Sequence, residues 1–192
     1  MPNWCSNVVT LVHTDRTMIS RAVKSTQKES LLNEFVPVPQ ALTETMEGSF
    51  GDALEQARLA AQREGNRRTY GYSSWYDFAI GEWGTKWDIS NGDNDYKIKK
   101  VDNGYTVTLY FDTAWSPPIN FYDKLLALEF NVNAMYYEPG VNFCGQYFDG
   151  QDETYELSNL SSEDARSQLP KELDLAFGIS ESIAEYEAEE ND

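Results

Sequence analysis

The sequence predicts an α+β protein built on an antiparallel sheet, and three observations favour this class. The 192 residues are 41% hydrophobic and 14% aromatic, which is enough apolar material for one well-packed core. Strand-like and helix-like periodicities follow one another along the chain. An Asn-Gly pair also separates two strand-like runs, which is the strongest short-range signal for a β-hairpin.

The chain opens with a β-α unit. Asn7–His13 is rich in β-branched residues and predicts the first strand. Thr14 or Asp15 suits the N-cap of a helix that runs to about Lys28. The apolar positions of this helix recur at helical spacing, at Met18, Ile19, Ala22 and Val23.

An inserted helical segment is expected at about 30–84. Phe35–Pro39 contains two prolines and is expected to be extended, whereas Asp52–Glu64 is rich in Ala, Leu, Gln and Glu and predicts an exposed helix. A short aromatic helix is expected at Trp75–Trp83, with Gly84 as its C-cap.

A strand and a hairpin are expected next. Thr85–Ser90 has the pattern of a strand. Asn103-Gly104 then separates the runs Tyr96–Val101 and Tyr105–Asp112, and the second run alternates apolar and polar residues. A sheet with one buried face requires this alternation.

The β-α order then repeats. Ser116–Pro118 suits a helix start, and Asn131–Tyr137 returns as a strand. Val141–Phe148 and Thr154–Leu157 predict further antiparallel strands. Strand, helix, strand pair, helix and strand in this order predict a split β-α-β, or ferredoxin-like, sheet with helices on one face.

Several motifs occur in order along the first 150 residues. The sequence resembles the YubB ferredoxin-like family at Met1–Asn7, Phe35–Pro39, Trp83–Asp88, Phe111–Pro118 and Tyr137–Gly140, and at Phe143 and Gly145. The resemblance implies a ferredoxin-like domain at 1–150 and a setting in phages, plasmids or other bacterial mobile elements. It implies no particular activity. The segment 151–192 falls outside the resemblance and is expected to be an acidic, partly helical extension.

Composition restricts the classes of function. The formal net charge of −17 repels a phosphate backbone or an anionic membrane. No apolar run reaches the roughly 18–20 residues of a membrane span, and no signal-peptide pattern opens the chain. We therefore expect an intracellular protein, and with the setting that the resemblance implies, a protein of the bacterial cytoplasm. Cys5, Cys144 and His13 are too few for a disulfide framework or a zinc site, and no cofactor motif is evident.

One short segment, Glu82–Asp88, places a base, two acids and two indoles within seven residues. A binding groove is one interpretation, in which the indoles stack on a ligand and Lys86 or Asp88 orients it. The other interpretation places Trp83 and Trp87 in the core, and the period-two alternation of a strand favours it.

Asp88, Asp112 and Glu138 lie at or near predicted strand ends, and with Lys86 they form a candidate groove. A carboxylate pair or trio can serve acid/base chemistry or bind Mg²⁺, so an enzyme is one alternative. The spacing of the three acids is not diagnostic, and separate strands commonly carry solvated acids. We therefore predict no catalytic residue, metal site or cofactor.

Binding of RNA or single strands on the sheet is a second alternative. Ferredoxin-like sheets bind single strands through exposed aromatic side chains, and Tyr110, Tyr136 and Tyr137 are the candidate stacking positions. The negative charge argues against this function, and no RNP-type motif accompanies the tyrosines.

Most of the charge lies in the last quarter of the chain. Asp149–Asp192 contains 14 Asp and Glu against 2 Arg and Lys, a net charge of −12, and the first 148 residues carry only −5. Leu169, Leu173 and Phe177 recur at helical spacing, so part of this segment is expected to dock. One interpretation is a solubilising terminus. The other is an acidic surface that engages a basic groove, because spaced carboxylates imitate phosphate charge.

The sequence thus predicts a non-enzymatic accessory protein that binds a protein partner. In its most specific form it is a DNA mimic that inhibits a basic, nucleic-acid-binding host protein, and direct binding of nucleic acid is not expected. The candidate contact residues are Glu172, Asp174, Glu181, Glu185, Glu187, Glu189 and Glu190.

Overall fold

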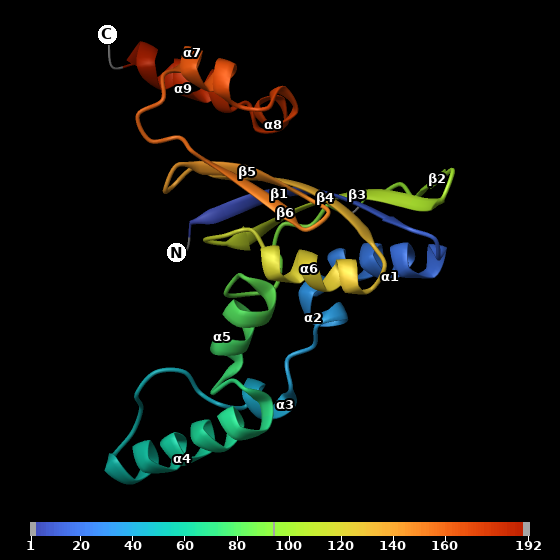
Figure 1. Cartoon of the computed structure of the whole chain (residues 1–192). Helices are drawn as coiled ribbons and strands as arrows, with labels where there is room; N and C mark the ends of the chain where they lie inside the picture. The colour runs from blue at the N-terminus through green and yellow to red at the C-terminus, as the bar shows by residue number, and fades with distance from the viewer. Residues whose placement is uncertain (1–2, 94, 190–192) are drawn as a thin grey trace.

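The computed structural model describes residues 3–93 and 95–189, and within these ranges six strands form one sheet (Figure 1). The strand order is β2-β3-β1-β4-β5-β6, and every neighbouring pair is antiparallel. The chain is therefore an α+β protein, as its sequence predicts. The strands are β1 (Trp4–His13), β2 (Lys99–Val101), β3 (Gly104–Ala114), β4 (Asn131–Glu138), β5 (Phe143–Phe148) and β6 (Gln151–Glu156).

The central strand β1 defines two faces of the sheet. Its side chains alternate, so that Cys5, Asn7, Val9, Leu11 and His13 are buried on what we call the inner face. Helices α1 (Arg16–Thr26) and α6 (Ile119–Ala127) cover this face (Figure 1). The main hydrophobic core lies between the sheet and these two helices. The alternate residues of β1 point to the opposite side, which we call the outer face. They are Trp4, Ser6, Val8, Thr10 and Val12.

Helix α1 follows the predicted β-α pattern. The Asp15 carboxylate accepts a hydrogen bond from the Thr17 backbone N–H and so caps the helix. Ile19, Ala22 and Val23 form the buried stripe, as expected from their spacing. The helix ends at Thr26, slightly before the predicted end at Lys28.

The predicted helical insertion lies between α1 and β2. Its longest helix begins at a capping box between Asp52 and Glu55 and ends at Gly71, which has a left-handed φ of 83°. Asn66 is the buried residue of this helix, which projects away from the sheet (Figure 1). The insertion contains α2 (Leu31–Phe35), α3 (Gln40–Thr43), α4 (Ala53–Tyr70), α5 (Trp75–Phe78) and the π-helical turn η1 (Ala79–Trp83).

The prediction of a strand at Thr85–Ser90 is wrong. This segment is irregular, and a single bridge joins Ser90 to Asp112 of β3. The reason is that its polar side chains bind backbone groups elsewhere: the Thr85 hydroxyl donates to the carbonyl of Ala114, and Asp88 accepts from α2. These contacts replace the ladder of hydrogen bonds that a strand needs.

The acidic extension packs against the outer face, so the prediction that helices cover one face is wrong for the whole molecule. Buried residues of the extension meet Cys144 of β5 in a second hydrophobic cluster, against which Met135 and Tyr137 of β4 also pack. Part of the extension therefore docks, as expected, and β6 continues the sheet beyond Gly150. The helices of the extension are α7 (Ser162–Gln168), α8 (Lys171–Phe177) and α9 (Ile179–Glu189) (Figure 1).

No helix within residues 3–93 and 95–189 combines the length and the apolar character needed to cross a bilayer.

Candidate functional site

Asp88, the first acid of the predicted groove, holds the start of α2. Its carboxylate accepts hydrogen bonds from the backbone N–H groups of Leu32 and Asn33, each 2.9 Å long, and from Ile89. Burial raises the pKa of Asp88 above its ordinary value, although these three hydrogen bonds oppose the shift. The residue thus fixes the insertion against the segment that follows η1.

Asp112 and Glu138 lie on opposite faces of the sheet. Asp112 is on the outer face, where it accepts hydrogen bonds from Ser6 and Asn91. Glu138 is fully buried on the inner side of β4, and it accepts from the backbone N–H groups of Gly140 and Val141. The three predicted carboxylates therefore do not converge. Among the described residues, no group of three or more His, Cys, Asp or Glu side chains is arranged to hold a metal ion.

Lys86, the base of the predicted groove, lies in an exposed cluster of indoles. Its ammonium nitrogen is 4.5 Å from the ring centroid of Trp87 and 4.8 Å from that of Trp115. Trp87 also contacts Trp4, with ring centroids 6.5 Å apart, and Trp115 at 6.4 Å. We call Trp4, Trp87 and Trp115 with Lys86 the tryptophan cluster.

The prediction for the two indoles of Glu82–Asp88 is half confirmed. Trp83 is buried in the core and is 5% exposed, but Trp87 is 38% exposed. The alternation argument failed because the segment is not a strand, and Thr85 rather than Trp87 fills the interior. Sequence reasoning missed Trp4 and Trp115 as partners, although they lie in the segments Met1–Asn7 and Phe111–Pro118 that it singled out.

Hydrogen bonds fix the two loops that carry the tryptophan cluster. The buried Thr85 hydroxyl donates to the carbonyl of Ala114 at 2.9 Å, and the Ser116 hydroxyl donates to the carbonyl of Gly84 at 2.7 Å. The Trp115 backbone N–H donates to the carbonyl of Asn3. Lys86, Trp87 and Trp115 are therefore held by short loops that are tied to each other and to the start of β1.

The predicted stacking tyrosines are mostly inaccessible. Tyr110 is 50% exposed on the outer face, but Tyr136 is 1% exposed and donates its hydroxyl hydrogen to Asp152. The ring of Tyr137 lies 5.9 Å from that of Phe177 in α8, so the extension covers it. Only Tyr110 remains available for stacking among these three positions.

The two cysteines are buried and free, and they do not meet His13. Cys5 lies on the inner face, whereas Cys144 joins the cluster beneath the extension. Burial raises the pKa of the Cys5 thiol well above its ordinary value and that of Cys144 to about 12. Both thiols are therefore protonated near neutral pH, as expected for structural rather than nucleophilic cysteines. His13 accepts a hydrogen bond from the backbone of Asp15 at the start of α1.

Two of the candidate contact residues, Asp174 and Glu187, accept hydrogen bonds within the extension. Asp174 accepts hydrogen bonds from the backbone N–H and the hydroxyl of Ser180, at 2.7 and 2.8 Å. Glu187 accepts from the same two groups of Ser162, and the hydroxyl bond is the main reason that the pKa of Glu187 is lowered. These contacts join α8 to α9 and α9 to α7.

The other described candidates face solvent. Glu181, Glu185 and Glu189 are exposed and follow one another at intervals of four residues on α9, so they lie along one side of the helix. Glu172 is exposed on α8. We call these four carboxylates the acidic face. Glu190 lies outside the described residues.

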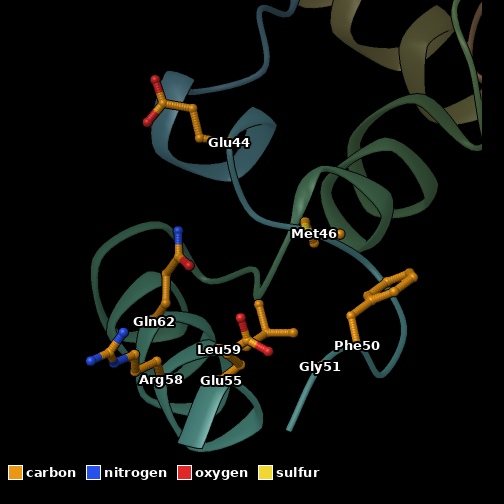
Figure 2. A pocket seen from close by; sticks show the side chains of 8 residues that line it. All are labelled: Glu44, Met46, Phe50, Gly51, Glu55, Arg58, Leu59 and Gln62. Atoms are coloured by element: carbon orange, nitrogen blue, oxygen red, sulfur yellow. The ribbon is translucent and has the colours of Figure 1, made fainter.

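A pocket of about 480 Å³ lies beside α4 in the insertion (Figure 2). Its apolar side chains Met46 and Phe50 are about half exposed, and its Glu55 carboxylate is engaged in the capping box. It brings together no catalytic pair, and we assign it no activity. The lining residues are Glu44, Met46, Phe50, Gly51, Glu55, Arg58, Leu59 and Gln62.

The fold and these sites define an α+β protein whose acidic segment packs on the sheet through α7–α9 and which has an exposed tryptophan cluster. Neither a family model nor a curated protein matches its sequence. Among solved structures, the chain is similar to the crystal structure of protein api92 from Yersinia pseudotuberculosis, which is described as DUF1281. The TM-score is 0.42 and the sequence identity 12%, over 83% of this chain and 99% of the other. This likeness is too weak to inform fold or function.

Proposed function

We propose that the chain is a non-enzymatic accessory protein that binds a basic protein partner through its acidic extension. The observation that carries the proposal is the acidic face, because Glu181, Glu185 and Glu189 repeat along one exposed side of α9. The helix rise places successive members about 6 Å apart, which makes a regular row of negative charge. A phosphate backbone presents a comparable row to the proteins that bind it.

The attachment of the extension supports this proposal over the alternative of a merely solubilising terminus. Leu173 of α8 and Ile179 of α9 are fully buried in the second hydrophobic cluster. Asp174 and Glu187 then tie the three helices together. A row of charges on a fixed helix binds with a smaller entropy cost than the same charges on a disordered chain.

The most specific form of the proposal is a DNA mimic that inhibits a nucleic-acid-processing or defence protein of a bacterial host. The resemblance to the YubB family supports a setting in a mobile element. We also propose that the core is ferredoxin-like. The order β2-β3-β1-β4, with α1 after β1 and α6 between β3 and β4, supports this assignment.

Affinity capture from a bacterial lysate tests the proposal. The full chain on a solid support should retain basic, nucleic-acid-binding proteins at low salt, and both NaCl and duplex DNA should release them. Glu181, Glu185 and Glu189 are exposed, so their replacement by glutamine should leave the fold intact. The triple variant E181Q/E185Q/E189Q should therefore capture much less of the basic proteins than the wild type does. If only acidic proteins or none are retained, the DNA-mimic proposal fails. Point variants are preferable to removal of 151–192, since that truncation would also remove β6.

A groove on the open part of the outer face supports one second candidate, the binding of single strands. Lys97, Lys99 and the exposed Tyr110 line this groove of about 400 Å³ together with the acid Asp95, so it combines one exposed ring with two bases and one acid. Filter binding of labelled oligonucleotides at low salt tests it. Retention that is lost in the variant Y110A would support the candidate, and no retention of any oligonucleotide would remove it.

A further inference from the structure

Three indoles are exposed side by side at the edge of the outer face. Trp4, Trp87 and Trp115 are 36%, 38% and 41% exposed, and their rings follow one another at 6.5 and 6.4 Å. A soluble surface seldom exposes neighbouring large apolar groups without a binding role. Tryptophan is also among the residues that contribute most to the affinity of protein interfaces.

The cluster already accommodates a cation. The Lys86 ammonium lies 4.5 Å from the ring centroid of Trp87, 4.8 Å from that of Trp115 and 5.8 Å from that of Tyr76. The aromatic faces attract positive charge through their quadrupoles. A guanidinium is planar and less strongly hydrated than an ammonium, so it stacks on an indole more favourably than Lys86 does.

The cluster is also pre-formed. The bonds from Thr85 to Ala114 and from Ser116 to Gly84 fix the two loops. Between them Trp115 has a φ of 70°, a left-handed conformation that a bulky residue rarely adopts. Such a backbone persists only where the surroundings impose it, and it is common at ligand-binding positions. A rigid indole loses little conformational entropy on binding.

The strand register places the cluster on the same face as the acidic extension. Ser6 pairs with Tyr137, whose ring contacts Phe177 of α8, and Trp4 lies two residues before Ser6 on the same side of β1. Protein interfaces usually combine aromatic residues with polar ones. Because the extension on this face is acidic, a surface complementary to this face is basic.

We propose that the tryptophan cluster is a docking site for an arginine side chain of the basic partner, with Lys86 occupying it until the partner binds. This inference rests on the proposed function, since it takes the partner to be basic. The arginine stacks on Trp87 and Trp115 while Lys86 moves into solvent, and the acidic face binds other positive groups of the same partner. Charge alone would attract many basic proteins to the acidic face. The cluster adds specificity because it also requires an arginine at a matching position on the partner.

The test is an NMR titration of the full chain with an oligo-arginine peptide, and with an oligo-citrulline peptide of the same length as the neutral control. The five tryptophans give five indole N–H signals, which single Trp→Leu variants assign. The signals of Trp4, Trp87 and Trp115 should shift with oligo-arginine and not with oligo-citrulline. The signal of the buried Trp83 should stay in place.

Two variants measure the contribution of the cluster. The substitution W87L should weaken oligo-arginine binding about two- to fivefold, and K86Q should strengthen it by a similar factor because the competing ammonium is gone. The exposed Phe148 supplies the control F148L for the loss of an aromatic ring, and the exposed Lys28 supplies the control K28Q for the loss of a charge. Equal effects of K86Q and K28Q would overturn the inference.

The outcomes separate this inference from the proposed function. If oligo-arginine shifts the backbone amides of α9 and leaves the three indoles unchanged, the docking site is wrong while the acidic face stands. If the indoles shift and the α9 amides do not, the cluster binds arginine and the acidic face is wrong. If neither shifts, both proposals fall.

Discussion

Asn7 illustrates how single buried polar residues hold this fold together. Its amide nitrogen donates to the carbonyl of Cys5 at 2.8 Å and to the hydroxyl of Thr113 at 2.9 Å, and its amide oxygen accepts from Tyr122 at 3.1 Å. These bonds link β1 to β3 and to α6, and Asn7 itself is buried. Asn7 thus has a structural role, since each buried polar group needs a partner in the core.

The contacts of Asn7 predict how much its substitution will destabilise the protein. The substitution N7A leaves the hydroxyls of Tyr122 and Thr113 without this partner and opens a small cavity, so the free energy of unfolding should fall by about 2–4 kcal/mol. The matched variant Y122F removes one hydrogen bond and should cost roughly 1–2 kcal/mol. Urea denaturation measures both. An N7A chain as stable as the wild type would show that the network contributes nothing.

Residue roles were predictable only where local pattern decides them. The cap at Asp15 and the turn at Gly84 follow from their immediate neighbours, and both are confirmed. Asp88 and Trp87 were not predictable in the same way. The partners of Asp88 are backbone groups of α2 more than 50 residues away, and Trp87 meets rings from two other motifs. No local periodicity contains that information.

At the scale of elements, the chain follows its periodicities in the main strands and helices and departs from them at Thr85–Ser90. The first strand, α1, the Asn-Gly hairpin and α6 form close to the predicted positions. The packing of α7–α9 on the outer face was not foreseen, because the apolar groups that receive them are divided among β4, β5 and β6. Pattern reasoning identifies an amphipathic helix, but not the surface that its apolar side will meet.

Leu173 of α8 is fully buried in the second hydrophobic cluster, so we expect it to contribute to docking of the extension. The substitution L173A should destabilise the packing of α7–α9 by about 2–5 kcal/mol, because it removes a buried side chain from the second hydrophobic cluster. Hydrogen exchange should then accelerate in these helices more than in β1. Leu175 on the same helix is 71% exposed, so L175A is the control and should leave exchange nearly unchanged. Equal acceleration in β1 and α9 would show that the extension does not open as a separate unit.

The contact between α9 and α7 should depend on pH. Hydrogen bonds from Ser162 lower the pKa of Glu187, so this contact stabilises the fold above the ordinary pKa of a glutamate and is lost as pH falls through the lowered value. The substitution S162A should raise the pKa of Glu187 toward its ordinary value, as an NMR titration of the side-chain carboxyl would measure. Ser167 lies on the same helix and donates to Asp164 instead, so S167A should leave that pKa unchanged. An unchanged pKa in S162A would contradict the contact.

At the scale of the whole molecule, one part of the chain forms most of the sheet and another part carries most of the negative charge. The first 148 residues carry a net charge of −5 and supply most of the sheet, whereas Asp149–Asp192 carries −12. The sequence was sufficient to locate this asymmetry. It was not sufficient to show that Asp174 and Glu187 are engaged internally while Glu181, Glu185 and Glu189 share one exposed side. That division depends on how three short helices pack.

The most direct test of the acidic face is the dissociation constant of the captured basic partner, measured over a range of NaCl concentrations. The triple variant E181Q/E185Q/E189Q is compared with E44Q/D102N/E129Q, which removes three exposed carboxylates from the first part of the chain. We expect the first triple to weaken binding about tenfold at low salt and to flatten the salt dependence, and the second to change it less than about twofold. Equal losses in the two triples would contradict the account, because overall charge rather than the acidic face would then determine binding.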